Sequence, residues 1–268
     1  METQQPSSPN QRIRAPKAIS QGGLDKIMSE QQHIVSAFDR DLEAIQAHIM
    51  KMGGMVEASI LDAAKSFDTR DVELAADVRA RDKAIDQLEI LINDEAAKLL
   101  ALRSPTAIDL RIVLSVIKVA SNLERIGDYS KNMAKRTTVL MEMPHVFDKG
   151  QGLRRLAREV ELMLKDALDA YVQRDVKLAE EVIQRDREVD QMYSGLFREY
   201  LSYMLEDPRN ITPCMHLHLM AKNIERMGDH VTSIAEQVIY FTTGERPQSP
   251  HLSSDKTSSD PNLSMNLE

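Results

Sequence analysis

A nine-residue block occurs twice in this chain, with the same polar residues at the same positions. The first copy is Ala-Ser-Asn-Leu-Glu-Arg-Ile-Gly-Asp at 120–128, and the second is Ala-Lys-Asn-Ile-Glu-Arg-Met-Gly-Asp at 221–229. A shorter block upstream repeats as well, since Arg-Asp-Lys-Ala-Ile-Asp-Gln at 81–87 matches Arg-Asp-Arg-Glu-Val-Asp-Gln at 185–191. Self-similarity at a spacing of 101 to 104 residues predicts that the chain folds as two copies of one unit.

The repeated unit is predicted to be helical. Aromatic residues make up only 4% of the chain and tryptophan is absent, whereas strands favour aromatic and β-branched residues. Between residues 33 and 67, apolar residues recur at steps of three or four, which is typical of one face of an α-helix: Phe38, Leu42, Ile45, Ile49, Met52, Val56 and Ile60. The pair Gly53-Gly54 within this stretch is expected either to bend the helix or to admit a close neighbour.

Turn residues divide the chain into six long helices. They are predicted at 33–67, 71–102, 105–139, 153–173 and 175–205, with a last helix that opens at Asp207-Pro208 or Thr212-Pro213 and ends near Phe241. Ser104 is predicted to cap the third helix, with Pro105 as its first residue. The sequence thus predicts an all-α fold of two tandem three-helix bundles, at 25–143 and 151–241. Polar tails at 1–24 and 243–268 are predicted to be disordered, and the sequence leaves open whether the bundles share a core or form an elongated pair.

Charge and composition exclude several classes of partner. The net charge is −8 and the pI about 5.5, which argues against a nucleic-acid surface because such surfaces need clustered Lys and Arg. Cys214 is the only cysteine, so an intrachain disulfide is excluded and the composition fits a reducing cytoplasm. The first residues lack an apolar signal segment, and no apolar stretch is long enough to cross a membrane.

The repeated blocks place acidic residues in pairs four positions apart. On an α-helix such a pair shares one face. The second and third helices of each bundle run in opposite directions, and the two pairs lie at similar distances from the turn between these helices. Four carboxylates should therefore lie close together in each bundle, where their mutual repulsion requires a compensating positive charge.

Clustered carboxylate oxygens are typical ligands of Mg²⁺, Mn²⁺ and Ca²⁺, and helical bundles also hold iron on such residues. The candidate metal ligands are Asp82, Asp86, Glu124, Asp128, Asp186, Asp190, Glu225 and Asp229. Asn132 is a candidate for an additional, weaker ligand, and Ser233 stands at the equivalent position of the second copy. The simpler alternative is a solvated charged face whose acids pair with neighbouring arginines, namely Arg81, Arg125, Arg185 and Arg226. Recurrence in both copies favours the metal, and the repeated Gly127 and Gly228 suggest a close helix approach or room for a bound group.

The repeated Asn-x-Glu-Arg-x-Gly-Asp block, preceded by Asp-x-x-x-Asp on the previous helix, resembles the PhoU family of phosphate-transport accessory proteins. The resemblance extends over residues 30–241 and includes the Met52-Gly-Gly-Met55-Val stretch. It implies two three-helix bundles that carry multinuclear metal clusters on the carboxylate residues named above, with Mg, Mn, Fe or Zn as the candidate ions. The substitution of Ser233 for Asn implies that the second cluster binds metal differently.

The resemblance also implies a function. Family members are cytoplasmic regulators that link the phosphate ABC transporter, through its ATPase subunit, to a sensor histidine kinase, and they repress the phosphate-starvation response when phosphate is abundant. We therefore expect a regulator that is not an enzyme, and association into a homodimer is a further expectation. Two alternatives stay open: a metal-dependent phosphohydrolase, for which no nucleophile or general base stands out, and a helical interaction module without metal.

Overall fold

The computed structural model describes the backbone of residues 21–143 and 151–247, with side chains from residue 37 onward. In this part the chain forms six α-helices and one short 3-10 helix: α1 (Gln21–Asp68), α2 (Val72–Arg103), α3 (Ala107–Met141), α4 (Gln151–Gln173), α5 (Val176–Glu206), η1 (Pro208–Asn210) and α6 (Ile211–Thr243). The predicted all-α fold with an internal repeat is confirmed. Most of the two predicted tails, and the break between the halves at 144–150, lie outside the described residues.

Equivalent residues of the two copies begin equivalent helices. The carboxylate of Asp71 accepts a hydrogen bond from the backbone N–H of Leu74 and caps α2. Asp175 caps α5 in the same way, by accepting from the backbone N–H groups of Lys177 and Leu178. These side chains satisfy backbone donors that a helix leaves unpaired at its first turn. The first helix differs from the prediction, because it begins at Gln21, before the apolar pattern starts.

The prediction for Ser104 was wrong. Ser104 ends α2 instead of beginning α3: it adopts the left-handed conformation (φ 44°, ψ 54°) and donates its backbone N–H to the carbonyl of Leu100. Pro105 has no N–H with which to continue that helix, and α3 begins only after Thr106. In the second copy, Asp207 and Pro208 open the 3-10 helix η1, and α6 follows it directly at Ile211, between the two predicted starting points.

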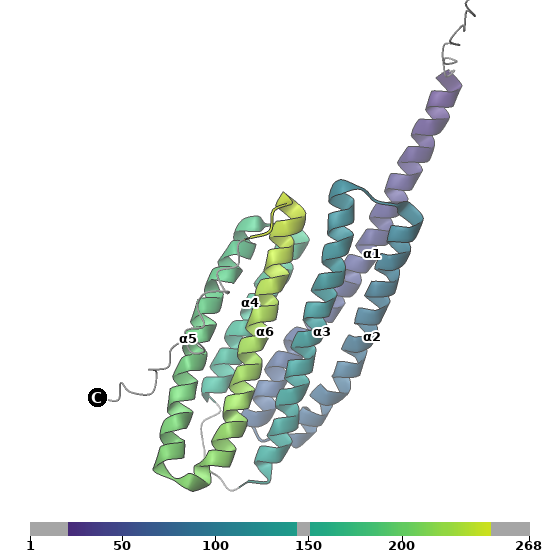
Figure 1. The fold of residues 1–268 in the computed structure, drawn as a ribbon. Coiled ribbons are helices and arrows are strands. Elements are labelled where there is room, and N and C mark those ends of the chain that lie inside the picture. The colour runs from purple at the N-terminus through teal and green to yellow at the C-terminus, as the bar shows by residue number, and fades with distance from the viewer. Residues whose placement is uncertain (1–20, 144–150, 248–268) are drawn as a thin grey trace, which may run out of the picture. The chain divides into compact units, whose positions relative to one another are not determined.

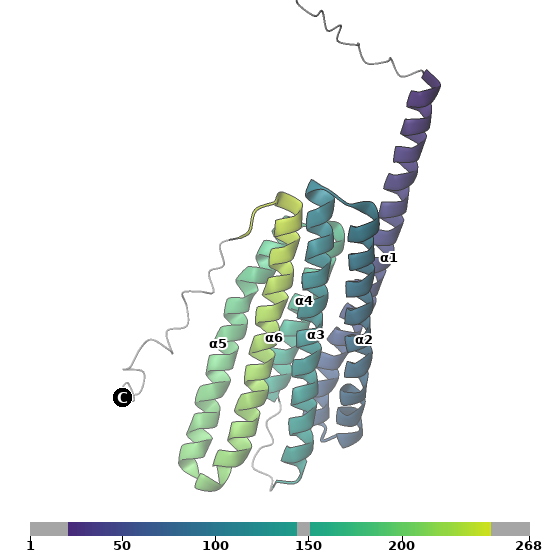
Figure 2. The same cartoon turned by 45° about the vertical axis from the view of Figure 1, so that its right-hand side comes forward.

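The residues from Asp41 onward form one compact unit, which contains the second bundle and all of the first except the beginning of α1. Within it, α5, α6, α3 and α2 lie side by side in one layer, with α4 and α1 behind them (Figure 1, Figure 2). The helices α3 and α6 run antiparallel, since Asn122 contacts His230 while Arg136, further along α3, contacts His216. The sequence left open whether the two bundles share a core or form an elongated pair. In the structure they pack side by side and share a core. No helix in residues 21–143 and 151–247 combines the length and apolar character that a membrane crossing requires.

The two neighbouring glycines of α1 have different surroundings. A Cβ atom at Gly53 would lie 2.5 Å from Cδ1 of the buried Leu168, on α4, whereas a Cβ atom at Gly54 would meet nothing within 4 Å. Gly53 therefore admits a close neighbour, which was one of its two predicted roles. The exposed Gly54 makes no such contact and only weakens the helix.

This difference predicts opposite effects for one substitution at adjacent positions. Gly54→Ala should raise the free energy of unfolding by up to about 1 kcal/mol, because alanine is the better helix former. Gly53→Ala gains the same propensity but overpacks the contact with Leu168, which costs roughly 1–3 kcal/mol. Urea unfolding should therefore rank Gly54→Ala above Gly53→Ala by at least about 1 kcal/mol. Equal stabilities would show that the contact between α1 and α4 is loose.

Candidate functional site

The repeated glycine brings the acidic helices of each copy into contact. A Cβ atom at Gly127 on α3 would lie 3.2 Å from Cδ1 of Ile85 and 3.9 Å from Oδ1 of Asp82, both on α2. A Cβ atom at Gly228 on α6 would lie 2.9 Å from Oδ1 of Asp186, on α5. The missing side chain thus allows close approach where the acidic residues lie, which confirms the interpretation of Gly127 and Gly228 as close-approach positions. It also confirms that the two acidic faces of each copy lie at the same height.

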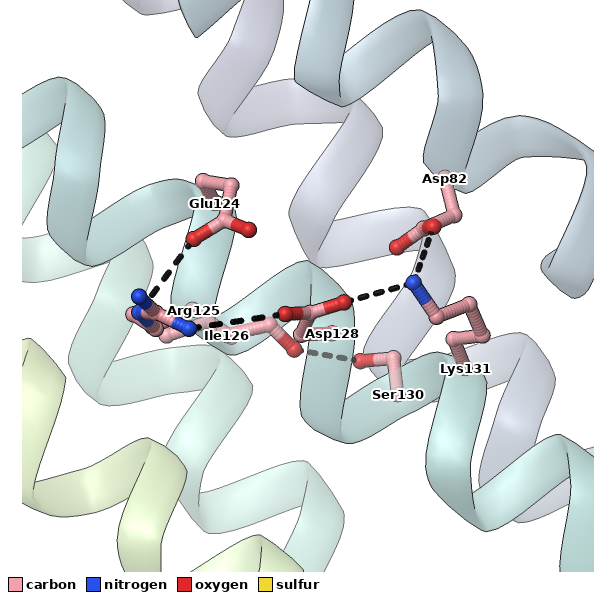
Figure 3. A network of polar contacts seen from close by, with 7 residues as sticks. All are labelled: Asp82, Glu124, Arg125, Ile126, Asp128, Ser130 and Lys131. Carbon is pink, nitrogen blue, oxygen red and sulfur yellow. Dashed lines mark hydrogen bonds and ion pairs between the residues drawn. The ribbon is translucent and has the colours of Figure 1, made fainter.

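In the first cluster, a lysine lies between carboxylates of two helices. The Lys131 Nζ atom is 2.5 Å from Oδ2 of Asp82 on α2 and 2.6 Å from Oδ1 of Asp128 on its own helix (Figure 3). On the other side of Asp128, the more exposed Arg125 reaches Oδ2 of Asp128 at 3.7 Å and Oε2 of Glu124 at 3.4 Å. Lys131 and Arg125 supply part of the positive charge that the cluster requires.

Protonation of the first cluster follows from these contacts. Burial, and next the neighbouring charge of Asp128, raise the pKa of Glu124 to about 7. Burial alone would raise the pKa of Asp128 too, but the hydrogen bond and charge of Lys131 outweigh it, and the pKa of Asp128 is lowered. Burial and the charge of Asp82 raise the pKa of Asp86. Glu124 is therefore partly protonated at neutral pH, while Asp128 is an anion.

The second cluster lacks an ammonium group at the corresponding place. Asp186 is only 1% exposed, and burial, followed by the charges of Asp190, Asp229 and Glu225, raises its pKa to about 7. The Lys222 Nζ atom pairs with Oε1 of Glu225 at 2.7 Å, at the edge of the cluster. Burial raises the pKa of Glu225 in spite of this ion pair. Asp186 thus lies among like charges, which is the environment that a bound cation would relieve.

Both lysines were missed by the sequence reasoning. Lys131 follows Asp128 by three residues, and Lys222 precedes Glu225 by three, and this spacing places each pair on one helix face. The repeat conceals them, because Thr232 stands in place of Lys131 in the second copy and Ser121 in place of Lys222 in the first. The two clusters are therefore chemically different in spite of their matching acids.

The arginines of the shorter upstream block pair with acids outside the clusters. Arg81 pairs with Asp62 of α1 at 2.9 Å, and the equivalent Arg185 pairs with Asp166 of α4 at 2.5 Å. Arg185 also contacts Glu159 at 2.6 Å. These ion pairs attach α2 and α5 to the first helix of their bundles. The alternative in which neighbouring arginines pair with the cluster acids therefore fails for Arg81 and Arg185, whereas it holds for Arg125.

The remaining candidates have distinct positions. Asp190 and Asp229 lie near enough to Asp186 to raise its pKa, as noted above. Asn132 is half-buried one turn beyond Asp128 on α3. Its counterpart Ser233 donates its hydroxyl to the backbone carbonyl of Asp229 at 3.0 Å. Ser233 is thus engaged with its own helix, which leaves Asn132 as the better extra oxygen donor.

The chemistry of the clusters fits a hard cation, but the side chains are not drawn together around one. In the part of the chain that the structure describes, no group of three or more His, Cys, Asp or Glu side chains is arranged to hold a metal ion. All eight predicted ligands offer carboxylate oxygens. Oδ1 of Asp82 and Oε2 of Glu225 are buried and lack a hydrogen-bond partner among the described residues. Such orphaned buried oxygens are destabilising, and a cation would satisfy them.

The comparisons with known proteins agree on one family. The model of the "PhoU domain" matches residues 49–137 and again residues 153–238. A Rhizobium meliloti protein named phosphate-specific transport system accessory protein PhoU homolog is 42% identical, with 84% of this chain and 95% of the relative covered. A Caulobacter vibrioides protein of the same name is 41% identical over 80% of this chain and 93% of the relative.

Solved structures give the same result. The crystal structure of PhoU from Pseudomonas aeruginosa superposes with a TM-score of 0.75 at 38% identity, and the match covers 78% of this chain and all of that one. The phosphate transport system regulatory protein PhoU from Streptococcus pneumoniae superposes with a TM-score of 0.71 at 27% identity, covering 78% of this chain and 98% of that one. The repeated motif, the fold built from two equivalent halves and these relatives lead to one conclusion: the chain belongs to the PhoU family.

Proposed function

We propose that this protein is a metal-binding regulator of phosphate uptake, and that it is not an enzyme. The observation that carries the proposal is the match to proteins named as accessory or regulatory components of phosphate transport systems, over 84% of this chain in one case. Its partners are the ATPase subunit of the phosphate ABC transporter and the sensor histidine kinase of the phosphate response. The proposal places the protein in the cytoplasm, as a homodimer, where it represses the starvation response when phosphate is abundant.

The metal-binding part of the proposal rests on the two acidic clusters. Asp82, Asp86, Glu124 and Asp128, with Asn132 as an additional donor, would hold the ions of the first copy. Asp186, Asp190, Glu225 and Asp229 would hold those of the second. Bound Mg, Mn, Fe or Zn ions would compensate the negative charge of the carboxylates. The side chains of each cluster come from two helices, so that binding would fix the surface formed by α2 with α3, or by α5 with α6.

A second candidate, a helical interaction module without metal, is favoured by one observation. Lys131 already neutralises Asp82 and Asp128 through two short ion pairs. In that case the clusters would be internal salt bridges, and the protein would dock to its partners without metal. Metal analysis of the protein purified without an affinity tag decides between the two. Less than one ion per chain would support the metal-free module.

The regulatory role predicts a phenotype for the acidic residues of α3 and α6. The double substitution Asp128→Ala with Asp229→Ala should lose metal and switch on phosphate-starvation genes in phosphate-rich medium. The matched control is Asp77→Ala with Glu181→Ala, because these exposed acids occupy equivalent positions in the two copies outside the clusters. A reporter fused to a starvation-induced promoter measures the effect. If the double variant retained both metal and repression, the proposal would be wrong.

The partners are tested by purification from native cells grown with abundant phosphate. Mass spectrometry of proteins captured with this chain should recover the transporter's ATPase subunit or the sensor kinase. Recovery of neither partner, under conditions that preserve weak complexes, would contradict the proposed adaptor role. Assaying the untagged protein for hydrolysis of phosphate esters would then test the phosphohydrolase alternative, for which no nucleophile or general base stands out in the sequence.

A further inference from the structure

A cleft with a basic rim lies where the end of α1 meets the beginning of α4, with α5 beside it. It encloses about 650 Å³, and its charged lining residues lie on α1 and α4, which carry none of the residues of the acidic clusters. Four basic side chains line it: Lys65 of α1, and Arg154, Arg155 and Arg158 of α4. All four are exposed, in a chain whose net charge is −8. A concentration of cations on an acidic protein indicates an anionic ligand.

Two of the four cations lack an acidic partner among the residues that the structure describes. Arg154 pairs with Asp68 at 2.8 Å, and Arg158 pairs with Glu161 at 2.8 Å. The other acid of the cleft, Glu159, is already bound by Arg185. Among the described residues neither Lys65 nor Arg155 forms an ion pair, so that these two charges are available to a ligand.

The floor of the cleft is apolar. Leu61 of α1 and Met192 of α5 line it, and both are partly exposed. Ligand pockets of about 300–1,000 Å³ typically combine an apolar lining with a few charged groups, and this cleft has that combination. A free phosphate ion would contact the basic rim but leave the floor and most of the volume empty.

The basic residues of the rim are not repeated at the equivalent positions of the other copy. At the positions equivalent to Arg154, Arg155, Arg158 and Lys65, the chain carries Met50, Lys51, Gly54 and Asp169. Only one of the four is basic, although both sets lie on the same two helices. The cluster of cations is therefore a feature of this cleft and not of the repeated unit.

We propose that this cleft binds an organic phosphate of about nucleotide size. Lys65 and Arg155 hold the phosphate groups, with Arg158 at the rim, and the organic part packs on Leu61 and Met192. Arginine suits this role because its planar guanidinium group can donate two parallel hydrogen bonds to phosphate oxygens. The site shares no residue with the metal clusters, and the proposal does not rest on the proposed regulatory partners.

The test is calorimetric titration of the full chain with ADP, in a buffer with EDTA so that metal does not contribute. We expect ADP to bind with a Kd below about 1 mM, and adenosine and inorganic phosphate to bind at least tenfold more weakly than ADP. Arg155→Gln should weaken ADP binding by about tenfold or more, because it removes a charge-assisted hydrogen bond. The matched control is Lys51→Gln, which removes the equivalent exposed cation of the other copy and should leave binding unchanged.

Each other outcome would overturn the proposal. If ADP failed to bind, the cleft would not be a site for an organic phosphate. If inorganic phosphate bound as tightly as ADP, the organic part of the ligand would not contribute to binding. An unchanged affinity in Arg155→Gln, or an equal loss in Lys51→Gln, would place binding elsewhere on the surface. Both positions are exposed, and circular dichroism with a thermal melt should confirm that the variants fold like the original chain.

Discussion

Replacing Lys131 by methionine is expected to lower the free energy of unfolding of the metal-free protein by about 2–3 kcal/mol. Methionine keeps most of the length of the side chain but removes the ammonium group that Asp82 and Asp128 share. Breaking a buried ion pair from one side typically costs about 3–5 kcal/mol, because the other charge is left uncompensated. Asp82 is buried, but Asp128 is 30% exposed at its side chain, which places the expected loss below that range. For a chain of this size the melting temperature should fall by about 5–10 °C.

The same variant tests the metal proposal, because a cation and the Lys131 ammonium compete for the same carboxylates. Added Mn²⁺ or Mg²⁺ should stabilise Lys131→Met more than the original chain, since the first cluster then carries an uncompensated negative charge. The control is Lys135→Met, one turn further on α3, where the lysine is exposed and lies outside the cluster. Thermal melts with and without metal measure both effects. A metal response no larger than that of the original chain would show that Lys131 does not occupy a metal position.

The sequence was sufficient to predict the helices, the repeat and the pairing of the acidic faces, because all three depend on local periodicity and on short connections. Asp71 and Asp175 begin helices as a capping residue should, and the close approach at Gly127 and Gly228 follows from the missing side chain. Ser104 was misassigned because Ser-Pro is compatible with either side of a turn. Only the hydrogen bond from its N–H to Leu100 decides between the two.

The charges that surround the clusters could not be predicted in the same way. The rotation of α2 against α1 determines whether Arg81 faces the cluster or Asp62, and periodicity within one helix does not fix that rotation. Lys131 was predictable in principle, since it lies three residues from Asp128. The repeat does not reveal it, because Thr232 stands at the equivalent position of the second copy. What the halves share predicted the fold, and where they differ determines the chemistry of each cluster.

That difference predicts opposite effects for one substitution at two equivalent positions. Asp186→Asn should stabilise the metal-free protein at pH 8, because it removes a buried negative charge that lies among other acids and keeps the size of the side chain. Asp82→Asn should destabilise it, because Lys131 loses a partner. A pKa raised from 3.8 to about 7 places an upper bound of about 4 kcal/mol on the gain from Asp186→Asn. Urea unfolding in EDTA at pH 8 measures both variants.

The pH dependence of the gain follows from the sign of the shift. The pKa of Asp186 is higher in the folded protein than in the unfolded chain, so that the folded state loses stability from this group as the pH rises from about 4 to 7. The gain from Asp186→Asn should therefore be near zero at pH 4 and complete above pH 7. Saturating metal should reverse the order at pH 8, because only the original chain keeps this carboxylate as a ligand. A gain that is the same at pH 4 and pH 8 would show that it comes from packing instead of charge, and the second cluster would then have no need of a cation.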